Sequence, residues 1–99
     1  MIKKVNKRGS DEVKVTFILP EDHPNADDMC VVGDFNEWKE GENAFVRRSN
    51  HTYSTNVMVK EGERYAFRYY SASSGWENEA EADAYETNEH GSDNCILLT

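Results

Sequence analysis

Two tryptophans in polar, turn-like surroundings are the residues of this chain whose chemistry is most distinctive. Trp38 ends the segment 33–38, with the sequence GDFNEW, and Trp76 follows the small-residue segment 71–75. An indole face that emerges from a turn can pack on the C–H face of a sugar ring, while neighbouring Asn, Asp and Glu side chains reach the sugar hydroxyls. The alternative interpretation is that both tryptophans are ordinary core residues.

Alternation along the aromatic-rich segment YAFRYY adds two further candidates. If Phe67 and Tyr69 point into a core, Arg68 and Tyr70 must face the opposite side of the sheet. That side continues directly into the loop that carries Trp76. An arginine and a tyrosine beside an exposed tryptophan would form a sugar-binding surface. An ordinary solvated sheet face is the other interpretation.

No group of residues indicates catalysis. Glycosidases use a pair of carboxylates, and no spacing singles out a pair among the nineteen Asp and Glu residues. The histidines, His23, His51 and His90, lie in polar turns, and no Cys/His spacing predicts zinc. The alternating acids from Glu79 to Asp83 lack the glycine and the final glutamate of a calcium-binding loop. We therefore expect a protein that is not an enzyme, with no metal and no cofactor.

Short strands separated by turns must position the candidate residues. Apolar or aromatic alternation predicts strands over 13–19, 29–32, 44–48, 52–59, 64–70 and 94–98. No segment has a helical stripe, and we expect residues 77–84 to be irregular. Short strands with turn signals at close intervals favour an all-β fold, an antiparallel β-sandwich of about seven strands.

Length and charge restrict the domain organisation and the partners. The chain has 99 residues, enough for a single domain over 1–99, in which segment 1–11 is a loose tail or an edge strand. Its net charge of −8 disfavours nucleic acid and anionic membranes as partners. No apolar run could cross a bilayer, and the basic start lacks the apolar centre of a secretory signal, which predicts a cytoplasmic protein.

Cys30 and Cys95 are expected as free buried thiols, unless their strands are neighbours and a disulfide forms.

The order of these pieces resembles a known family. A strand ends in GDFNEW, an EGERYAFRYY hairpin follows, and a loop leads to Trp76 and then to DAYETNEHGSDNCILL. This order is similar to the early-set domain that precedes the catalytic barrel of isoamylases and glycogen branching enzymes. The same domain type is the glycogen-binding domain of the AMP-activated kinase β subunit, carbohydrate-binding module family 48. The resemblance spans about Val13 to Leu98 and implies an immunoglobulin-like sandwich.

The resemblance also implies a shallow α-glucan site on particular residues. The two stacking tryptophans of the glycogen-binding members fall on Trp38 and Trp76. The basic residue that bonds sugar hydroxyls falls on Arg68, where such binders often have lysine. The asparagine before the last strand falls on Asn94, and a small hydroxyl residue falls on Ser92.

This chain departs from the kinase-type binders at the rim of the implied site. His90 precedes the glycine where those binders have leucine, and segment 71–75 differs in length from their tight turn. His90 and Tyr70 are additional candidate contacts. The leading hypothesis is a non-catalytic module for α-1,4-linked glucan such as glycogen or starch, acting beside a glycogen-metabolising enzyme. The alternative is an accessory or protein-interaction early-set domain that has lost sugar binding.

Overall fold

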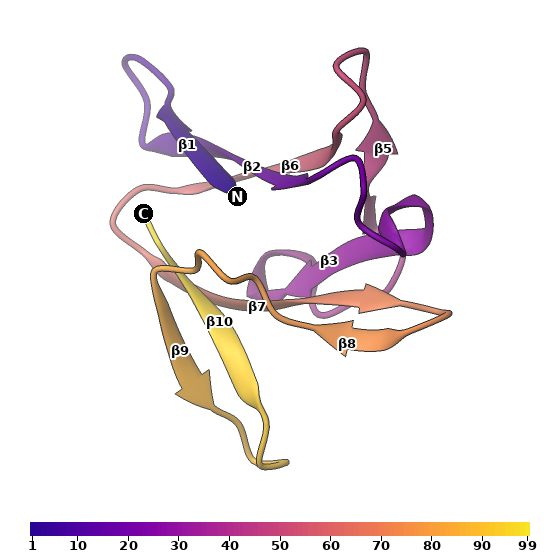
Figure 1. The fold of residues 1–99 in the computed structure, drawn as a ribbon. Helices are drawn as coiled ribbons and strands as arrows, with labels where there is room; N and C mark the ends of the chain where they lie inside the picture. Colours follow the sequence, from indigo (N-terminus) through magenta and orange to yellow (C-terminus); the bar gives the residue numbers. More distant parts are fainter.

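Two antiparallel β-sheets pack face to face in the computed structural model, which describes all residues from Met1 to Thr99 (Figure 1). The smaller sheet has the strand order β1-β2-β6-β5, and the larger has the order β4-β3-β7-β10-β9, with β8 paired to β7. The strands of the smaller sheet are β1 (Ile2–Asn6), β2 (Glu12–Leu19), β5 (Val46–Arg47) and β6 (Tyr53–Lys60). Those of the larger sheet are β3 (Met29–Gly33), β4 (Asn43–Ala44), β7 (Arg64–Ser71), β8 (Gly75–Glu77), β9 (Ala84–Thr87) and β10 (Asp93–Leu98).

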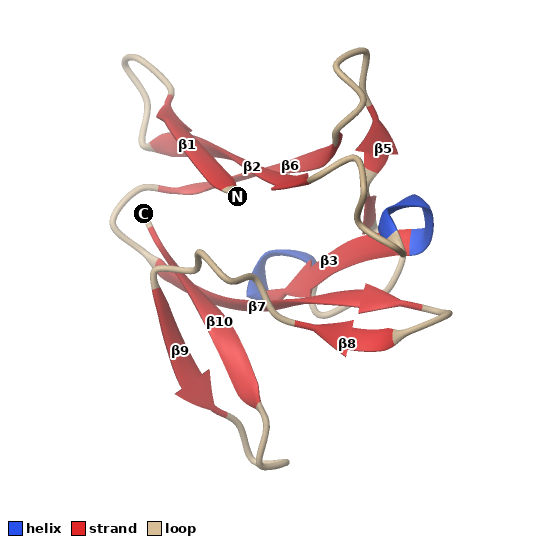
Figure 2. Ribbon diagram, viewed as in Figure 1, coloured by secondary structure: helices blue, strands red, loops and turns tan.

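The remaining chain forms turns and two short 3-10 helices, η1 (Ala26–Asp28) and η2 (Asp34–Asn36) (Figure 2). Neither of these helices has the length or the apolar character to cross a membrane. The all-β, immunoglobulin-like antiparallel sandwich predicted from the sequence is confirmed, with strands in two layers and helices only as single turns.

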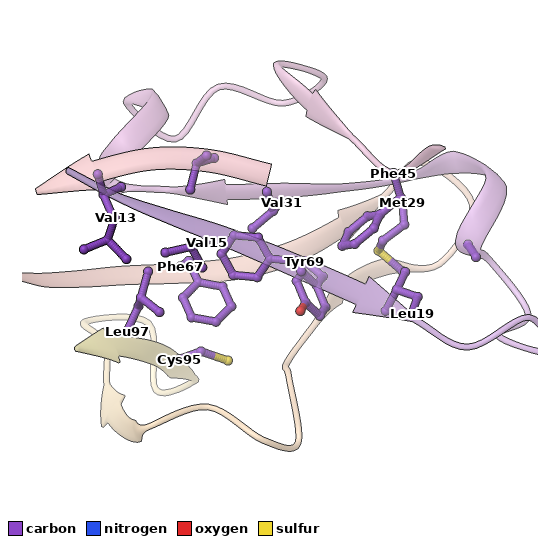
Figure 3. Packing of buried hydrophobic residues seen from close by; sticks show 14 residues of the cluster. Val13, Val15, Leu19, Met29, Val31, Phe45, Phe67, Tyr69, Cys95 and Leu97 are labelled. Carbon is purple, nitrogen blue, oxygen red and sulfur yellow. The ribbon is translucent and has the colours of Figure 1, made fainter. Parts of the chain in front are cut away.

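A core of 14 buried residues lies between the two sheets (Figure 3). Strand β2 contributes alternate residues from Val13 to Leu19, as the pattern of its sequence predicts. The Phe17 ring centroid is 5.1 Å from that of Phe67 and 6.2 Å from that of Tyr69. This aromatic packing fixes the inward residues of β7, and the pleat of the strand turns the residues between them outward.

Segment 44–48 differs from the single strand that we expected. β4 pairs with β3 in the larger sheet, whereas β5 pairs with β6 in the smaller sheet, so the chain crosses between the sheets at Phe45. Phe45 is 5% exposed, and its ring meets that of Tyr69 edge-on at a centroid distance of 5.3 Å. Burial of this one side chain in the core explains why the chain changes sheets here instead of continuing as one strand.

Two strands near the candidate residues were not expected. Residues 72–74 form the turn between β7 and β8, so Trp76 lies on a strand, and β9 follows the irregular residues 78–83. All four residues of β9 are exposed, which explains why its sequence lacks apolar alternation. The N-terminal segment forms β1, an edge strand that pairs with β2.

The two cysteines lie on different strands of the larger sheet. Cys30 is on β3 and Cys95 is on β10, and both are buried free thiols. Strand β7 lies between β3 and β10, so these strands are not neighbours. Burial raises the pKa of the Cys95 thiol, which keeps it protonated at neutral pH.

Candidate functional site

The outward face of β7 carries two of the predicted site residues. Phe67 and Tyr69 are 0% and 1% exposed in the core, whereas Arg68 and Tyr70 lie half-buried on the opposite side, which confirms the predicted alternation. Tyr70 is the register partner of Trp76 on β8, so both side chains stand on the outer face of the larger sheet.

A cavity of about 520 Å³ lies on this outer face. It is lined by Trp38, Arg68, Trp76, Asn88, Glu89, His90, Ser92 and Asn94. The five principal residues predicted from the sequence and His90 thus meet at one place, although they come from three separate parts of the chain. Tyr70 does not line this cavity. Asn88 and Glu89 do, and sequence reasoning missed them.

Arg68 lies at the point along β7 where the neighbouring strand changes from β10 to β8. β10 pairs with β7 up to the Cys95–Phe67 pair, and β8 pairs with β7 from Tyr69 onward. The Arg68 Nε atom donates to Asn78 Oδ1 at 2.8 Å, and Asn78 Nδ2 donates to the backbone oxygen of Asp93 at 3.0 Å. Asn78 therefore bridges β7 and β10 at the point where β8 replaces β10 as the neighbour of β7. It binds Arg68 through Nε only, which leaves the terminal guanidinium nitrogens available to a ligand.

Trp76 is held between aromatic and cationic neighbours. Its ring centroid lies 4.8 Å from that of Tyr70, and the carbon at the centre of the Arg68 guanidinium lies 5.5 Å from the Trp76 ring centroid. The indole remains 45% exposed. These contacts orient the ring without covering it, so Trp76 can offer a flat apolar surface to a ligand.

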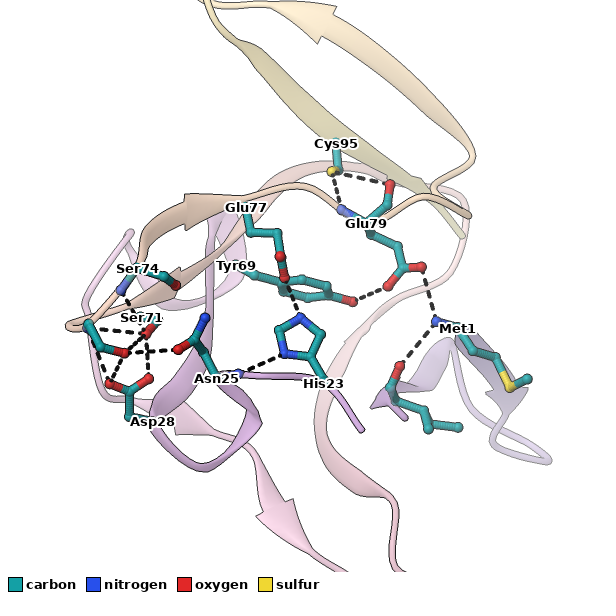
Figure 4. A network of polar contacts seen from close by, with 12 residues as sticks. Met1, His23, Asn25, Asp28, Tyr69, Ser71, Ser74, Glu77, Glu79 and Cys95 are labelled. Carbon is teal, nitrogen blue, oxygen red and sulfur yellow. Dashed lines mark hydrogen bonds and ion pairs between the residues drawn. The ribbon is translucent and has the colours of Figure 1, made fainter. Parts of the chain in front are cut away.

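The β7–β8 hairpin that carries Trp76 is also fixed from behind (Figure 4). The amide of Asn25 donates to His23 Nδ1 at 3.2 Å, so Nδ1 is an acceptor and Nε2 carries the proton that is donated to Glu77 Oε2 at 2.6 Å. Asp28 accepts hydrogen bonds from the hydroxyls of Ser71 and Ser73, and these bonds lower its pKa below the ordinary value of 3.8. Both ends of the hairpin are therefore tied to the segment that precedes β3.

Behind the hairpin, a buried carboxylate links the core to the chain after β8. Glu79 is 6% exposed and accepts a 2.6 Å hydrogen bond from the Tyr69 hydroxyl and a 3.0 Å hydrogen bond from the α-ammonium of Met1. Burial acts to raise the pKa of Glu79, but these donors outweigh it, so the pKa lies below the ordinary value of 4.5. Burial, together with the charge of Glu79, raises the pKa of Tyr69 well above 10.0. This network is structural and lies outside the cavity.

Trp38 owes its position to the turn after β3. Glu37 and Trp38 both adopt left-handed backbone angles, with φ of 57° and 58°. Such a conformation costs roughly 1–2 kcal/mol for each residue with a side chain. The turn is stabilised by Asp34, whose Oδ1 accepts a 2.9 Å bond from the Trp38 indole N–H and whose Oδ2 accepts a 2.8 Å bond from the Ala66 amide. Strained backbone that is held by specific contacts is a feature typical of functional sites.

The polar side chains of the GDFNEW segment have structural roles. Asn36 Oδ1 accepts from the Gly33 amide at 3.0 Å, while Asn36 Nδ2 donates to the Val31 oxygen at 3.0 Å and to Asn43 Oδ1 at 2.9 Å. Neither Asn36 nor Asp34 lines the cavity. The hydrogen bonds of these Asn and Asp side chains hold the turn that presents Trp38, and they do not contribute to the cavity lining.

Asn88 organises the opposite rim of the cavity. Its Oδ1 accepts from the backbone amides of His90 at 2.9 Å and Ser92 at 3.2 Å. Because these two groups can only donate, the orientation of the Asn88 amide is fixed. Its Nδ2 then donates to Asn94 Oδ1 at 3.1 Å, so the oxygen of Asn94 is occupied and its NH₂ group remains free. Asn94 can therefore act toward a ligand as a hydrogen-bond donor.

Comparison with known proteins agrees with this geometry. The family model for carbohydrate-binding module 48 (isoamylase N-terminal domain) matches residues 9–86. The match includes Trp38, Arg68 and Trp76, and it ends before the rim segment 88–94. No curated protein gives a significant match. Because the family model covers most of the chain and the fold is an early-set β-sandwich, this protein belongs to the carbohydrate-binding module 48 (isoamylase N-terminal domain) family.

Proposed function

We propose that this protein is a non-catalytic module that binds α-1,4-linked glucan of the glycogen or starch type. The observation that carries the proposal is the single cavity lined by Trp38 on one turn and Trp76 on the β7–β8 hairpin. Two fixed indoles suit a ligand that presents apolar C–H faces on successive units. A sugar chain has this property, and family membership supports carbohydrate as the ligand class.

The polar lining matches the hydroxyl groups of such a ligand. Arg68 and Asn94 offer donors whose other hydrogen-bonding atoms are already engaged by the protein, and Ser92 adds a hydroxyl. Glu89 adds a carboxylate acceptor to the lining. A sugar hydroxyl both donates and accepts, so it can satisfy either kind of group.

The carboxylates support binding without hydrolysis. Glycoside hydrolysis requires two carboxyl groups across the scissile bond, whereas the cavity contains one, Glu89. Glu79 is a buried carboxylate, but it accepts a hydrogen bond from the Tyr69 hydroxyl and does not line the cavity. We therefore infer that residues 1–99 act as one binding domain, which in the cytoplasm would hold a glycogen-metabolising enzyme near its substrate.

The first test is a titration of intrinsic tryptophan fluorescence with maltoheptaose, with cellohexaose as the linkage control. Both tryptophans of the chain line the cavity, so we expect a saturable change with the α-linked sugar alone. Depletion by insoluble starch or glycogen provides an independent readout. We expect Trp38→Ala and Trp76→Ala each to reduce it, by about 0.5–1.5 kcal/mol beyond the lost contact area if aromatic pairs are a guide.

Met58→Ala is the matched control, because Met58 is an exposed apolar residue (48%) on the smaller sheet. Unchanged depletion in the double tryptophan variant would place binding elsewhere. Folded protein that responds to neither sugar would favour the accessory or protein-interaction role.

A further inference from the structure

A second, smaller cavity lies on the same outer face. Its volume is about 290 Å³, and its lining includes Cys30, Ala44, Tyr70 and Ala72 together with the carboxylates of Asp27, Asp28 and Glu40. Tyr70 is thus common to both regions, because it packs against Trp76 and also lines the second cavity. The two cavities share no lining residue, so the second is a separate space.

Strand register places the second cavity in line with the first. Ala44 on β4 pairs with Cys30 on β3, Cys30 pairs with Tyr70 on β7, and Tyr70 pairs with Trp76 on β8. These four residues form one row across the outer face, because register partners in a sheet point to the same side. Tyr70 also lies two residues, about 7 Å, beyond Arg68 along β7. A ligand that continues past Trp76 would therefore next meet Tyr70.

The groups around the second cavity suit another sugar unit. The Tyr70 hydroxyl makes no hydrogen bond within the protein, although the ring is half-buried and held by Trp76. Glu40 is exposed and takes part in no ion pair or side-chain hydrogen bond. The Tyr70 ring provides an apolar wall, while its hydroxyl and the Glu40 carboxylate provide polar partners for sugar hydroxyls.

We propose that the second cavity is a further subsite, in which a glucan chain bound at Trp76 continues over Tyr70 toward Ala44. This inference rests on the proposed function and makes it more specific: the preferred ligand is a chain of several units, and affinity rises with chain length. It also assigns a binding role to Tyr70 that is separate from its support of Trp76.

The test compares maltotriose with maltoheptaose in the full chain by calorimetry. Tyr70→Phe removes only the hydroxyl, and Ala44→Leu fills the cavity beside Tyr70. We expect each to weaken maltoheptaose binding about two- to tenfold, the effect of one net hydrogen bond or a small contact, while maltotriose binding is unchanged. Tyr53→Phe is the matched control, because the Tyr53 hydroxyl also lacks a hydrogen-bond partner but lies on the smaller sheet.

The outcomes separate the two proposals. Equal affinity of the unmodified protein for both sugars, or variants that bind both sugars as the unmodified protein does, would overturn the subsite and leave glucan binding intact. Equal weakening for both sugars would also overturn it, because Tyr70 would then act only through Trp76. No binding of any α-glucan by the unmodified protein would overturn the proposed function and the subsite together.

Discussion

The Arg68 guanidinium lies 5.5 Å from the Trp76 ring centroid while its Nε is bonded to Asn78 at 2.8 Å. Both contacts come from the β8 segment, because Trp76 lies on β8 and Asn78 follows it, whereas Arg68 belongs to β7. The long arginine side chain is thus restricted before any ligand arrives. Less conformational entropy is then lost on binding, which matters for a shallow site that makes few contacts.

Substitutions of Arg68 should separate its charge from its geometry. Arg68→Lys keeps a cation near Trp76 but loses both the Nε donor to Asn78 and the terminal guanidinium nitrogens, so we expect weaker glucan binding with a small change in stability. Arg68→Gln also removes the cation–π contact, which should lower the free energy of unfolding by about 0.5–1 kcal/mol. Urea denaturation and sugar titration measure the two effects. Glutamine and lysine variants that bind as tightly as the unmodified protein would show that Arg68 has only a structural role.

Asn88→Asp should reverse the orientation of the Asn94 amide. An aspartate still accepts the two amide hydrogen bonds from His90 and Ser92, but its other oxygen can only accept, so Asn94 must turn its NH₂ toward residue 88. The cavity then loses a donor, and we expect glucan binding to weaken with little change in unfolding free energy. The Asn94 side-chain NH₂ signal in ¹⁵N NMR should become protected from exchange.

Asn88→Ala provides the comparison for this prediction. It removes the acceptor for the His90 and Ser92 amides as well, so it should lower both stability and binding. If Asn88→Asp loses as much stability as Asn88→Ala, the role of Asn88 is to hold the loop and not to orient Asn94.

The sequence predicts most of the sandwich because its main strands bury one face completely. β2 is the clearest case, since its residues from Val13 to Leu19 alternate between buried and outward positions. The pattern fails where burial does not alternate. β9 has four exposed residues, and the change of sheet between β4 and β5 depends on one buried side chain, Phe45, whose partner Tyr69 is distant in sequence.

In the candidate site too, the sequence predicts some residues and misses others. Trp38 could be predicted from the GDFNEW motif at a strand end, Arg68 from the alternation along residues 64–70, and Trp76 from its place after a small-residue loop. The residues that hold them could not. Asp34 supports Trp38 partly through the Ala66 amide, 32 residues away, and Asn78 becomes important only where two strands diverge beside Arg68. Such roles depend on tertiary contacts that local sequence does not encode.

Gly33→Ala should destabilise the fold and disturb the Trp38 turn. Gly33 has an extended backbone, so its conformation does not require glycine, but an added Cβ would lie 2.6 Å from the Ala66 oxygen and 2.8 Å from the Phe67 Cβ. Overpacking of this kind typically costs about 1–3 kcal/mol. Urea denaturation measures the loss. Gly62→Asn is the control, because Gly62 has a positive φ of 78° with open space around it, and asparagine tolerates that conformation. Equal stability of both variants would contradict the close approach of β3 and β7 at Gly33.

Acid should weaken the fold through Glu79. The pKa of Glu79 in the folded protein lies below the ordinary value of 4.5, so its stabilising contribution is complete above that pH and is lost as the pH falls through the folded pKa. Asp83, bonded to Lys4 and to the Leu98 amide despite partial burial, has a pKa below 3.8 and extends the loss to lower pH. We expect the free energy of unfolding from urea titrations to be constant near pH 6–7 and to fall below about pH 4.5.

Two substitutions assign this acid dependence to Glu79. Glu79→Gln removes the titrating group, so the variant should be less stable at pH 7 but should lose less stability between pH 5 and 3 than the unmodified protein. Tyr69→Phe removes the hydroxyl that donates to the carboxylate, which leaves a buried charge with fewer partners. Its cost at pH 7 should be about 1–3 kcal/mol, and because the folded pKa of Glu79 then rises, the total acid-induced loss should shrink as it does in Glu79→Gln. Parallel acid profiles for all three proteins would show that other carboxylates determine the acid sensitivity.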